Sequence, residues 1–172
     1  MSPIEKLDVA LAGLGAVLSS RRVAVPPYQR LYAWTDEQSS ALFKDLNDAI
    51  RNKESEYFLG TVVIAKEPTG GQWVIDGQQR LTTTSILLAS IRDYFLKNGD
   101  SERASIIQQG HLSKKDLETL EDTPYIKLND TDHDFYLNRI LARPGKDRDA
   151  LSPASSLTES RCPAKGRPRN RS

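Results

Sequence analysis

The chain has 172 residues, about the length of one domain and long enough to enclose one hydrophobic core. Its 24 Lys and Arg residues nearly balance its 23 Asp and Glu residues, which argues against a globally basic nucleic-acid-binding protein. The single cysteine, Cys162, excludes an intrachain disulfide. One cysteine and two histidines are also too few for an ordinary structural zinc site.

The charge is unevenly distributed. Residues 151–172 contain five basic residues and one acidic residue, which leaves 19 basic and 22 acidic residues before them. The apolar stretch at residues 9–19 is interrupted by Gly13 and Gly15 and follows charged residues, so it fits neither a signal peptide nor a membrane span. We therefore expect a cytoplasmic protein that does not contact a membrane.

The first 34 residues predict a helix, a short strand and a loop. Ser2 to Glu5 has the residues of a helix start and precedes leucines at helical spacing, which predicts a helix over residues 3–19. Residues 22–25 form a β-type run that the two following prolines must end. Residues 28–34 carry three aromatic side chains without a clear period, which indicates a packed loop.

A second capping sequence, Thr35 to Gln38, predicts a helix that continues to about Asn52. Its apolar residues have the spacing of one buried face. These residues are Leu42, Leu46, Ala49 and Ile50.

The middle of the chain predicts a hairpin followed by a long helix. Residues 57–65 and 72–75 are rich in β-branched and aromatic side chains and flank a loop that contains proline and glycine. Asp76 and Gly77 end the second strand, and the helix that follows should end near Asn98 and Gly99. Its predicted apolar face consists of Thr84, Leu87, Leu88, Ile91 and Phe95.

The remaining residues predict less regular structure. Residues 100–123 are polar and should be helical in part, residues 125–128 should form a short strand, and residues 130–141 should form a helix. The apolar members of that last helix are Phe135, Leu137 and Ile140. Residues 145–172 are too poor in apolar side chains to offset the cost of ordering, so we expect them to be disordered.

The strand, turn and helix around residue 76 carry the features of a binding site. A helix N-terminus presents unpaired N–H groups and partial positive charge, and therefore favours an anion. A glycine lets the backbone approach that anion, and an arginine in the first turn adds a forked donor for phosphate. The candidate binding residues are Gly77, Gln78, Gln79, Arg80 and Thr82.

Asp76 does not fit a simple anion site, because a carboxylate beside a phosphate is repulsive unless it holds Mg²⁺ or orients a water molecule. That misfit suggests catalysis, with Asp76 and Arg80 as the candidate catalytic residues and Asp76 as the candidate metal ligand. The alternative is that Asp76 only caps the helix and Gly77 only makes the turn. The chain contains no Walker A sequence, so nucleotide chemistry would need another phosphate cradle.

Three segments carry a family resemblance: Val25 to Arg30 with Tyr32 and Trp34, Tyr57 to Gly60, and Val74 to Thr83 with its Asp-Gly-Gln-Gln-Arg sequence. In this order and spacing the chain resembles the N-terminal domain of the GmrSD-type restriction endonucleases. The resemblance covers about residues 15–98 and implies an α+β fold of the ParB/sulfiredoxin-like type. That fold would place a small mixed sheet at residues 22–75, with helices packed against it.

The resemblance implies a domain that binds and hydrolyses a nucleoside triphosphate, GTP or ATP, with Mg²⁺. In the family this turnover is coupled to recognition of modified invading DNA, and an HNH-type nuclease domain usually follows. By position, residues 76–80 correspond to the family's nucleotide motif. Tyr28, Gln29 and Arg30 correspond to a second signature beside the same pocket.

The similarity fades after about Arg143, so we expect a domain over residues 1–143 and a basic Ser/Pro/Arg tail over residues 144–172. The tail resembles terminated or out-of-frame coding sequence, and no nuclease motif remains. Asp132-His133-Asp134 is only superficially similar to an HNH element, and Asp132 is expected to cap a helix.

Two other functions stay open from the sequence. In the first alternative, the chain is a ParB-like module that binds DNA or a partner without nucleotide turnover. In the second, it is an inactive, truncated relic. Tyr28, Tyr32 and Trp34 would stack on a base in a binding role, whereas in a structural role they pin their loop to the core. The tail arginines would contact DNA phosphates or would only keep the chain soluble.

Overall fold

The computed structural model describes residues 9–20, 22–66 and 70–145. Its helices are α1 (Leu14–Ser20), α2 (Asp36–Arg51), α3 (Gln78–Lys97), α4 (Ser101–Ile107) and α5 (Asp130–Phe135), and two π-helical segments are η1 (Gln108–Leu112) and η2 (Tyr136–Leu141). Its strands are β1 (Val23–Ala24), β2 (Val63–Lys66), β3 (Gln72–Asp76), β4 (Ser113–Lys115), β5 (Asp122–Pro124) and β6 (Ile126–Lys127). The α+β class is confirmed.

Four strands form a mixed sheet in the order β2-β3-β1-β6. β1 runs parallel to both β3 and β6, whereas β2 pairs antiparallel with β3. The sheet is therefore wider than the predicted region of residues 22–75, because the strand near residue 126 joins it. β4 and β5 form a separate two-stranded hairpin that the sequence patterns did not predict.

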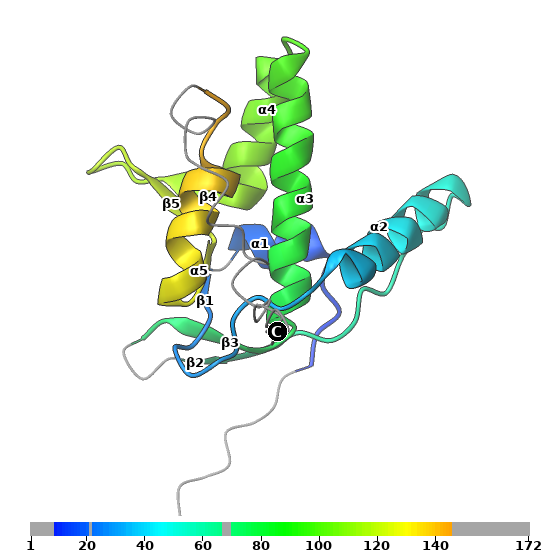
Figure 1. Cartoon of the computed structure of the whole chain (residues 1–172), viewed down its shortest axis with the longest axis horizontal. Coiled ribbons are helices and arrows are strands. Elements are labelled where there is room, and N and C mark those ends of the chain that lie inside the picture. Colours follow the sequence, from blue (N-terminus) through cyan, green and yellow to red (C-terminus); the bar gives the residue numbers. More distant parts are fainter. Residues whose placement is uncertain (1–8, 21, 67–69, 146–172) are drawn as a thin grey trace, which may run out of the picture.

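Figure 1 shows α3 as the long central helix, with α4 beside it, α5 on one side and the sheet at its base, while α2 projects away on the other side. The hydrophobic core lies between the sheet and the helices. Its buried members include Leu18, Val23, Val74, Leu81, Leu112, Ile126 and Tyr136. Burial raises the pKa of the Tyr136 phenol to about 12, and its hydroxyl bonds to Ser85 of α3.

Several predicted elements match the structure. The strand at residues 22–25, the loop at residues 28–34, the helix that Thr35 caps and the long helix after Gly77 are all present. The capping box of α2 forms as predicted, since the Thr35 N–H donates to the Gln38 side chain over 2.8 Å. The strand at residues 125–128 and the partly helical stretch after residue 100 are also confirmed.

Other expectations were wrong in detail. The first helix begins only at Leu14. Residues 9–13 are not helical, and the Leu11 side chain, which was expected on the apolar face of this helix, is 85% exposed. Residues 1–8 lie outside the described part. Residues 57–62 are irregular, and β2 begins at Val63. In α2 the side chain of Ile50 is exposed, whereas Leu42 and Ala49 are buried. The predicted disorder of residues 145–172 falls almost wholly on residues that the structure does not describe.

The buried face of α3 also differs from the predicted apolar face. It includes Thr82, Ser85 and Arg92, and Arg92 has 0% exposure. Ser85 and Arg92 are buried because they form hydrogen bonds with the C-terminal helical segments, Ser85 with Tyr136 and Arg92 with the Leu141 carbonyl oxygen. The search for apolar periodicity does not detect such polar residues, so it predicted a different buried face for α3. Ile91, predicted to be buried, is 37% exposed.

None of the helices in the described ranges is both long enough and apolar enough to cross a membrane.

Candidate functional site

The parallel arrangement brings three loops to one edge of the sheet. β1, β3 and β6 are parallel, so their carboxyl ends share this edge, where open α/β sheets commonly bind ligands. The loop after β1 contains residues 26–34, Gly77 alone separates the end of β3 from α3, and α5 follows β6. The two sequence segments expected near one pocket, residues 28–30 and 76–80, are therefore neighbours.

Gly77 directly precedes α3, at its N-cap position, in a conformation that favours glycine. Its φ is 88°, and a Cβ there would lie 3.0 Å from Val62 Cγ2 and 3.2 Å from the Thr61 carbonyl oxygen. Within the ranges that the structure describes, no side chain caps the N-terminus of this 20-residue helix. The first turn of α3 thus combines a helix dipole with N–H groups that need an acceptor. The alternative that Asp76 caps the helix does not hold, because the capping position belongs to Gly77.

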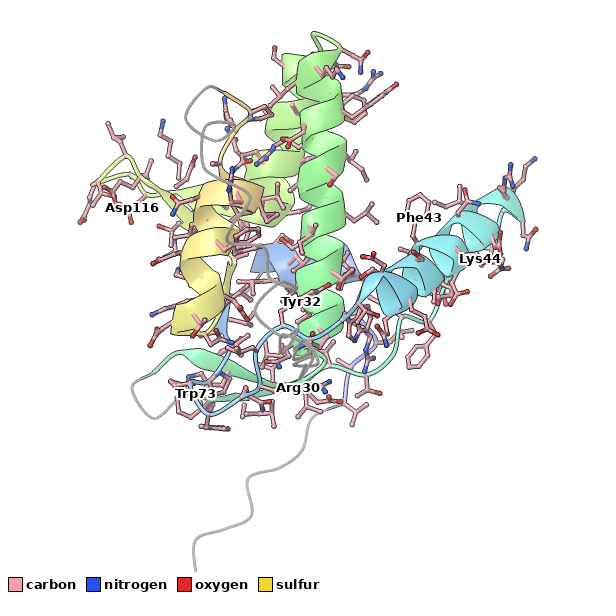
Figure 2. All side chains as sticks on the ribbon, in the orientation of Figure 1. Arg30, Tyr32, Phe43, Lys44, Trp73 and Asp116 are labelled. Carbon is pink, nitrogen blue, oxygen red and sulfur yellow. The ribbon has the colours of Figure 1, made fainter. Side chains whose placement is uncertain are left out.

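Asp76 is the last residue of β3, and its side chain is exposed. The loop with the second signature is tied to the same strand end, because Gln29 Nε2 donates to the Ile75 carbonyl oxygen over 3.0 Å. Tyr28 is 69% exposed and meets Trp73 edge to face, with ring centroids 6.0 Å apart. Figure 2 shows Arg30 and Trp73 at the sheet end of the molecule, away from the helical end.

The two glutamines of the Asp-Gly-Gln-Gln-Arg sequence are buried, and their side chains hold the loop after β1. Gln78 Nε2 donates to the Arg30 carbonyl oxygen over 2.9 Å, and Gln79 Nε2 donates to that of Leu31 over 3.2 Å. Gln79 Oε1 accepts the Ala33 N–H over 2.8 Å. Each amide nitrogen thus bonds to this loop through one of its two N–H donors, while the backbone N–H groups of both residues lie in the first turn of α3.

Arg80 connects the site to the third signature segment. Its Nη1 donates to the Leu59 carbonyl oxygen over 3.4 Å, and a Cβ on Gly60 would lie only 1.9 Å from Nη1. Gly60 has a φ of 112°, a conformation that L side chains rarely adopt. The glycine of Tyr57 to Gly60 is therefore needed for the position of the Arg80 guanidinium.

A small hollow of about 10 Å³, close to the space that one water molecule needs, lies between this loop and the first turns of α3 and α5. Arg30, Tyr32, Thr82 and Asp132 are among the residues that line it. Thr82 is 2% exposed, and Gln78 Oε1 is buried without a hydrogen-bond partner among the described residues. The hollow is therefore far smaller than the ~300–1,000 Å³ of typical ligand pockets.

Asp132 has a different role from the predicted helix cap. Asn129 caps α5 by accepting the Asp132 N–H, and the buried Asp132 carboxylate accepts the Tyr32 N–H over 2.7 Å. Tyr32 is also held by Thr83, over 2.9 Å between the two hydroxyl oxygens. This supports the structural role for Tyr32.

The neighbouring His133 is partly buried. Burial and the nearby Lys127 lower the pKa of His133. Within the described residues, no three His, Cys, Asp or Glu side chains gather to hold a metal ion.

Fold and site together define an α+β domain with an uncapped helix N-terminus and an exposed carboxylate at the carboxyl edge of its sheet. Residues 14–161 match the family described as GmrSD restriction endonuclease, N-terminal domain, and the chain belongs to this family. The predicted resemblance is confirmed. None of the curated proteins compared with the chain matches it.

Sequence reasoning missed how the signature residues support one another. It treated Gln78 and Gln79 as ligand donors, and it did not connect Gly60 with Arg80. The sequence offered one signal of this support: two adjacent glutamines start the helix and threonines follow them. If such amide side chains are buried, they need hydrogen-bond partners in another segment. The partners themselves lie more than 40 residues away, and only the fold identifies them.

Proposed function

We propose that this domain binds a nucleoside triphosphate with Mg²⁺ and hydrolyses it, as the sensor part of a modification-dependent restriction system. The observation that carries the proposal is the uncapped N-terminus of α3, which begins at a glycine in the left-handed region beside an exposed aspartate. Helix N-termini preceded by glycine are common phosphate sites. The family also supports a role in DNA restriction, in which a nuclease domain acts with this one.

In this proposal the phosphates lie against the backbone of residues 77–79, where they accept N–H groups of the first turn of α3. Arg80 and Arg30 contribute positive charge to the phosphates. Asp76 holds Mg²⁺ or orients the attacking water. Bound Mg²⁺ would neutralise phosphate charge and so remove the repulsion between Asp76 and the triphosphate. Such a domain would act in the cytoplasm, where nucleotides and invading DNA are present.

Replacing Arg80 with alanine should weaken nucleotide binding about 10- to 100-fold, because a charged hydrogen bond contributes about 1.5–3 kcal/mol. Calorimetric titration of GTP and ATP with Mg²⁺ measures this loss. The matched control is Arg103→Ala, which removes an exposed arginine of α4 that pairs with Asp100. If Arg80→Ala binds and hydrolyses both nucleotides like the unmodified chain, the phosphate site is not here.

A second function, DNA binding without turnover, is favoured by the exposed Tyr28 beside Trp73. The two rings meet edge to face with centroids 6.0 Å apart, and an exposed aromatic ring can stack on an unpaired base. Tyr28→Ala should then reduce the affinity for modified DNA by about 1–3 kcal/mol, measured by fluorescence anisotropy. Tyr94→Ala, which removes an exposed tyrosine of α3, should have no effect. Affinity for DNA that depends on added nucleotide would favour the first function.

A further inference from the structure

Residues 30–34 of the loop after β1 are held by hydrogen bonds from two sides. The side-chain amides of Gln78 and Gln79, in the first turn of α3, bond to the backbone of four of these residues. The backbone N–H of the fifth, Tyr32, donates to the Asp132 carboxylate of α5 over 2.7 Å. The path of this loop therefore depends on α5 as well as on the signature residues of α3.

The Asp132 carboxylate is itself fixed in place. Asp132 is 5% exposed, and Asn129 Nδ2 donates over 3.3 Å to the oxygen that accepts the Tyr32 N–H. α5 continues directly into η2, whose Tyr136 is fully buried and bonds to Ser85 of α3. A buried, oriented acceptor on an anchored helix can hold the backbone of a neighbouring loop in one position.

This loop carries Arg30, a residue that the proposed function places at the phosphates. The Arg30 side chain is exposed and lines the small hollow together with Asp132. Figure 2 shows Arg30 at the sheet end of the molecule, where α3 begins. A long, exposed arginine side chain has many rotamers, so its backbone determines which positions the guanidinium can reach. A shift of the loop would move the guanidinium, and a misplacement of about 1 Å can cost about 100-fold in rate.

We propose that Asp132 is a positioning residue for nucleotide binding. Its carboxylate holds the Tyr32 N–H and thereby keeps the Arg30 guanidinium within reach of the phosphates, without touching the nucleotide itself. This inference rests on the proposed function, because it requires the phosphates to lie at the first turn of α3. It makes α5, which lies outside the signature segments, part of the nucleotide site.

The contact offers a matched pair of variants. The Tyr32 N–H needs an oxygen acceptor but not a negative charge, so Asp132→Asn should keep the bond through its amide oxygen. Asp132→Leu is similar in size but leaves the Tyr32 N–H without this acceptor. If Asp132→Leu does not unfold cooperatively, Asp132→Ser takes its place, because the serine oxygen lies one bond closer to the main chain and does not reach the N–H group.

Hydrogen exchange followed by nuclear magnetic resonance tests the hold on the loop without nucleotide. The Tyr32 N–H should exchange several-fold faster in Asp132→Leu than in the unmodified chain, and Asp132→Asn should restore the slow rate. The Val25 N–H, which donates to the Lys127 carbonyl oxygen over 2.8 Å, is the reference for overall stability. Equal acceleration at Tyr32 and Val25, or none at Tyr32, would overturn the proposal.

A double-mutant cycle on nucleotide binding tests whether Asp132 acts through Arg30. Arg30→Ala should raise the dissociation constant for GTP or ATP with Mg²⁺ about tenfold in the unmodified chain and in Asp132→Asn. Asp132→Leu alone should raise it by a similar factor, and adding Arg30→Ala to it should then change it less than about twofold. Arg80→Ala should have the same effect with and without Asp132→Leu, because the Leu59 carbonyl oxygen, outside this loop, holds Arg80.

The outcomes separate this proposal from the proposed function. If the unmodified chain binds neither nucleotide, the proposed function fails, and the role of Asp132 in nucleotide binding falls with it. If nucleotide binds but Arg30→Ala has the same effect in every Asp132 background, the positioning role alone is overturned. If Asp132→Leu diminishes the effects of Arg30→Ala and Arg80→Ala alike, it perturbs the whole domain, which also overturns the positioning role.

Discussion

Replacing Arg92 with methionine should lower the free energy of unfolding by about 3–5 kcal/mol, which is the usual cost of removing one partner from a buried charged network. Arg92 is fully buried in α3, and all five of its N–H donors are used. Nη1 donates to Leu141 O and Gln108 Oε1, each over 2.6 Å. Nη2 donates to two further carbonyl groups around the end of η2, over 3.0 and 3.1 Å.

The loss arises because methionine fills the space but leaves these oxygens without donors. Three of them are carbonyl oxygens of residues 140–142, at the end of η2. The last carbonyl groups of a helix lack N–H donors from a following turn, so they need donors from elsewhere. A lysine cannot replace Arg92, because its single ammonium group has three donors at one point, whereas the planar guanidinium of Arg92 directs five donors to acceptors on different sides. Arg92 therefore acts as the C-terminal cap of η2, supplied by a distant helix.

Urea unfolding followed by circular dichroism measures this change. The matched control is Arg103→Met on α4, whose ion pair with Asp100 spans 2.7 Å but leaves the Arg103 side chain 69% exposed. An exposed pair contributes at most about 1 kcal/mol, so the control should remain close to the unmodified chain. Equal losses in the two variants would show that Arg92 does not hold the C-terminal helices to α3.

Local sequence signals were sufficient for most element boundaries near the site. Thr35 and Gln38 form the predicted capping box, and Gly77 separates β3 from α3 as the Asp-Gly sequence indicated. These features depend on residues within a few positions of each other, so composition and spacing reveal them. The family signature is of the same kind, because its segments are short and contiguous.

Long-range polar contacts could not be predicted in the same way. Arg92, Gln79 and Asp132 lie in polar or amphipathic stretches, and the periodicity rule places such residues on a solvated face. Each is buried because a segment at least 16 residues away supplies its partners. For the same reason the predicted buried face of α3 was wrong: it included Ile91, whereas Ser85 and Arg92 are more buried than Ile91.

Changing Asp76 to asparagine should reduce the rate of nucleotide hydrolysis about 100- to 10,000-fold, the range expected when a positioned acid or base is lost. Nucleotide affinity without metal should stay the same or rise slightly, because the substitution removes a negative charge near the phosphates. This split between binding and turnover distinguishes Asp76 from Arg80, whose loss should chiefly weaken binding. Phosphate release and metal-free titration measure the two effects separately.

The dependence on Mg²⁺ separates the two possible roles of the Asp76 carboxylate. If it binds the metal, Asp76→Asn should need a higher Mg²⁺ concentration for half-maximal rate, because the amide keeps one oxygen ligand but loses the charge. If it orients water, the rate at saturating Mg²⁺ should fall without that shift. Asp45→Asn on α2, which alters an exposed aspartate bonded to Tyr57, is the matched control. Unchanged hydrolysis in Asp76→Asn would remove this exposed residue at the end of β3 from the chemistry.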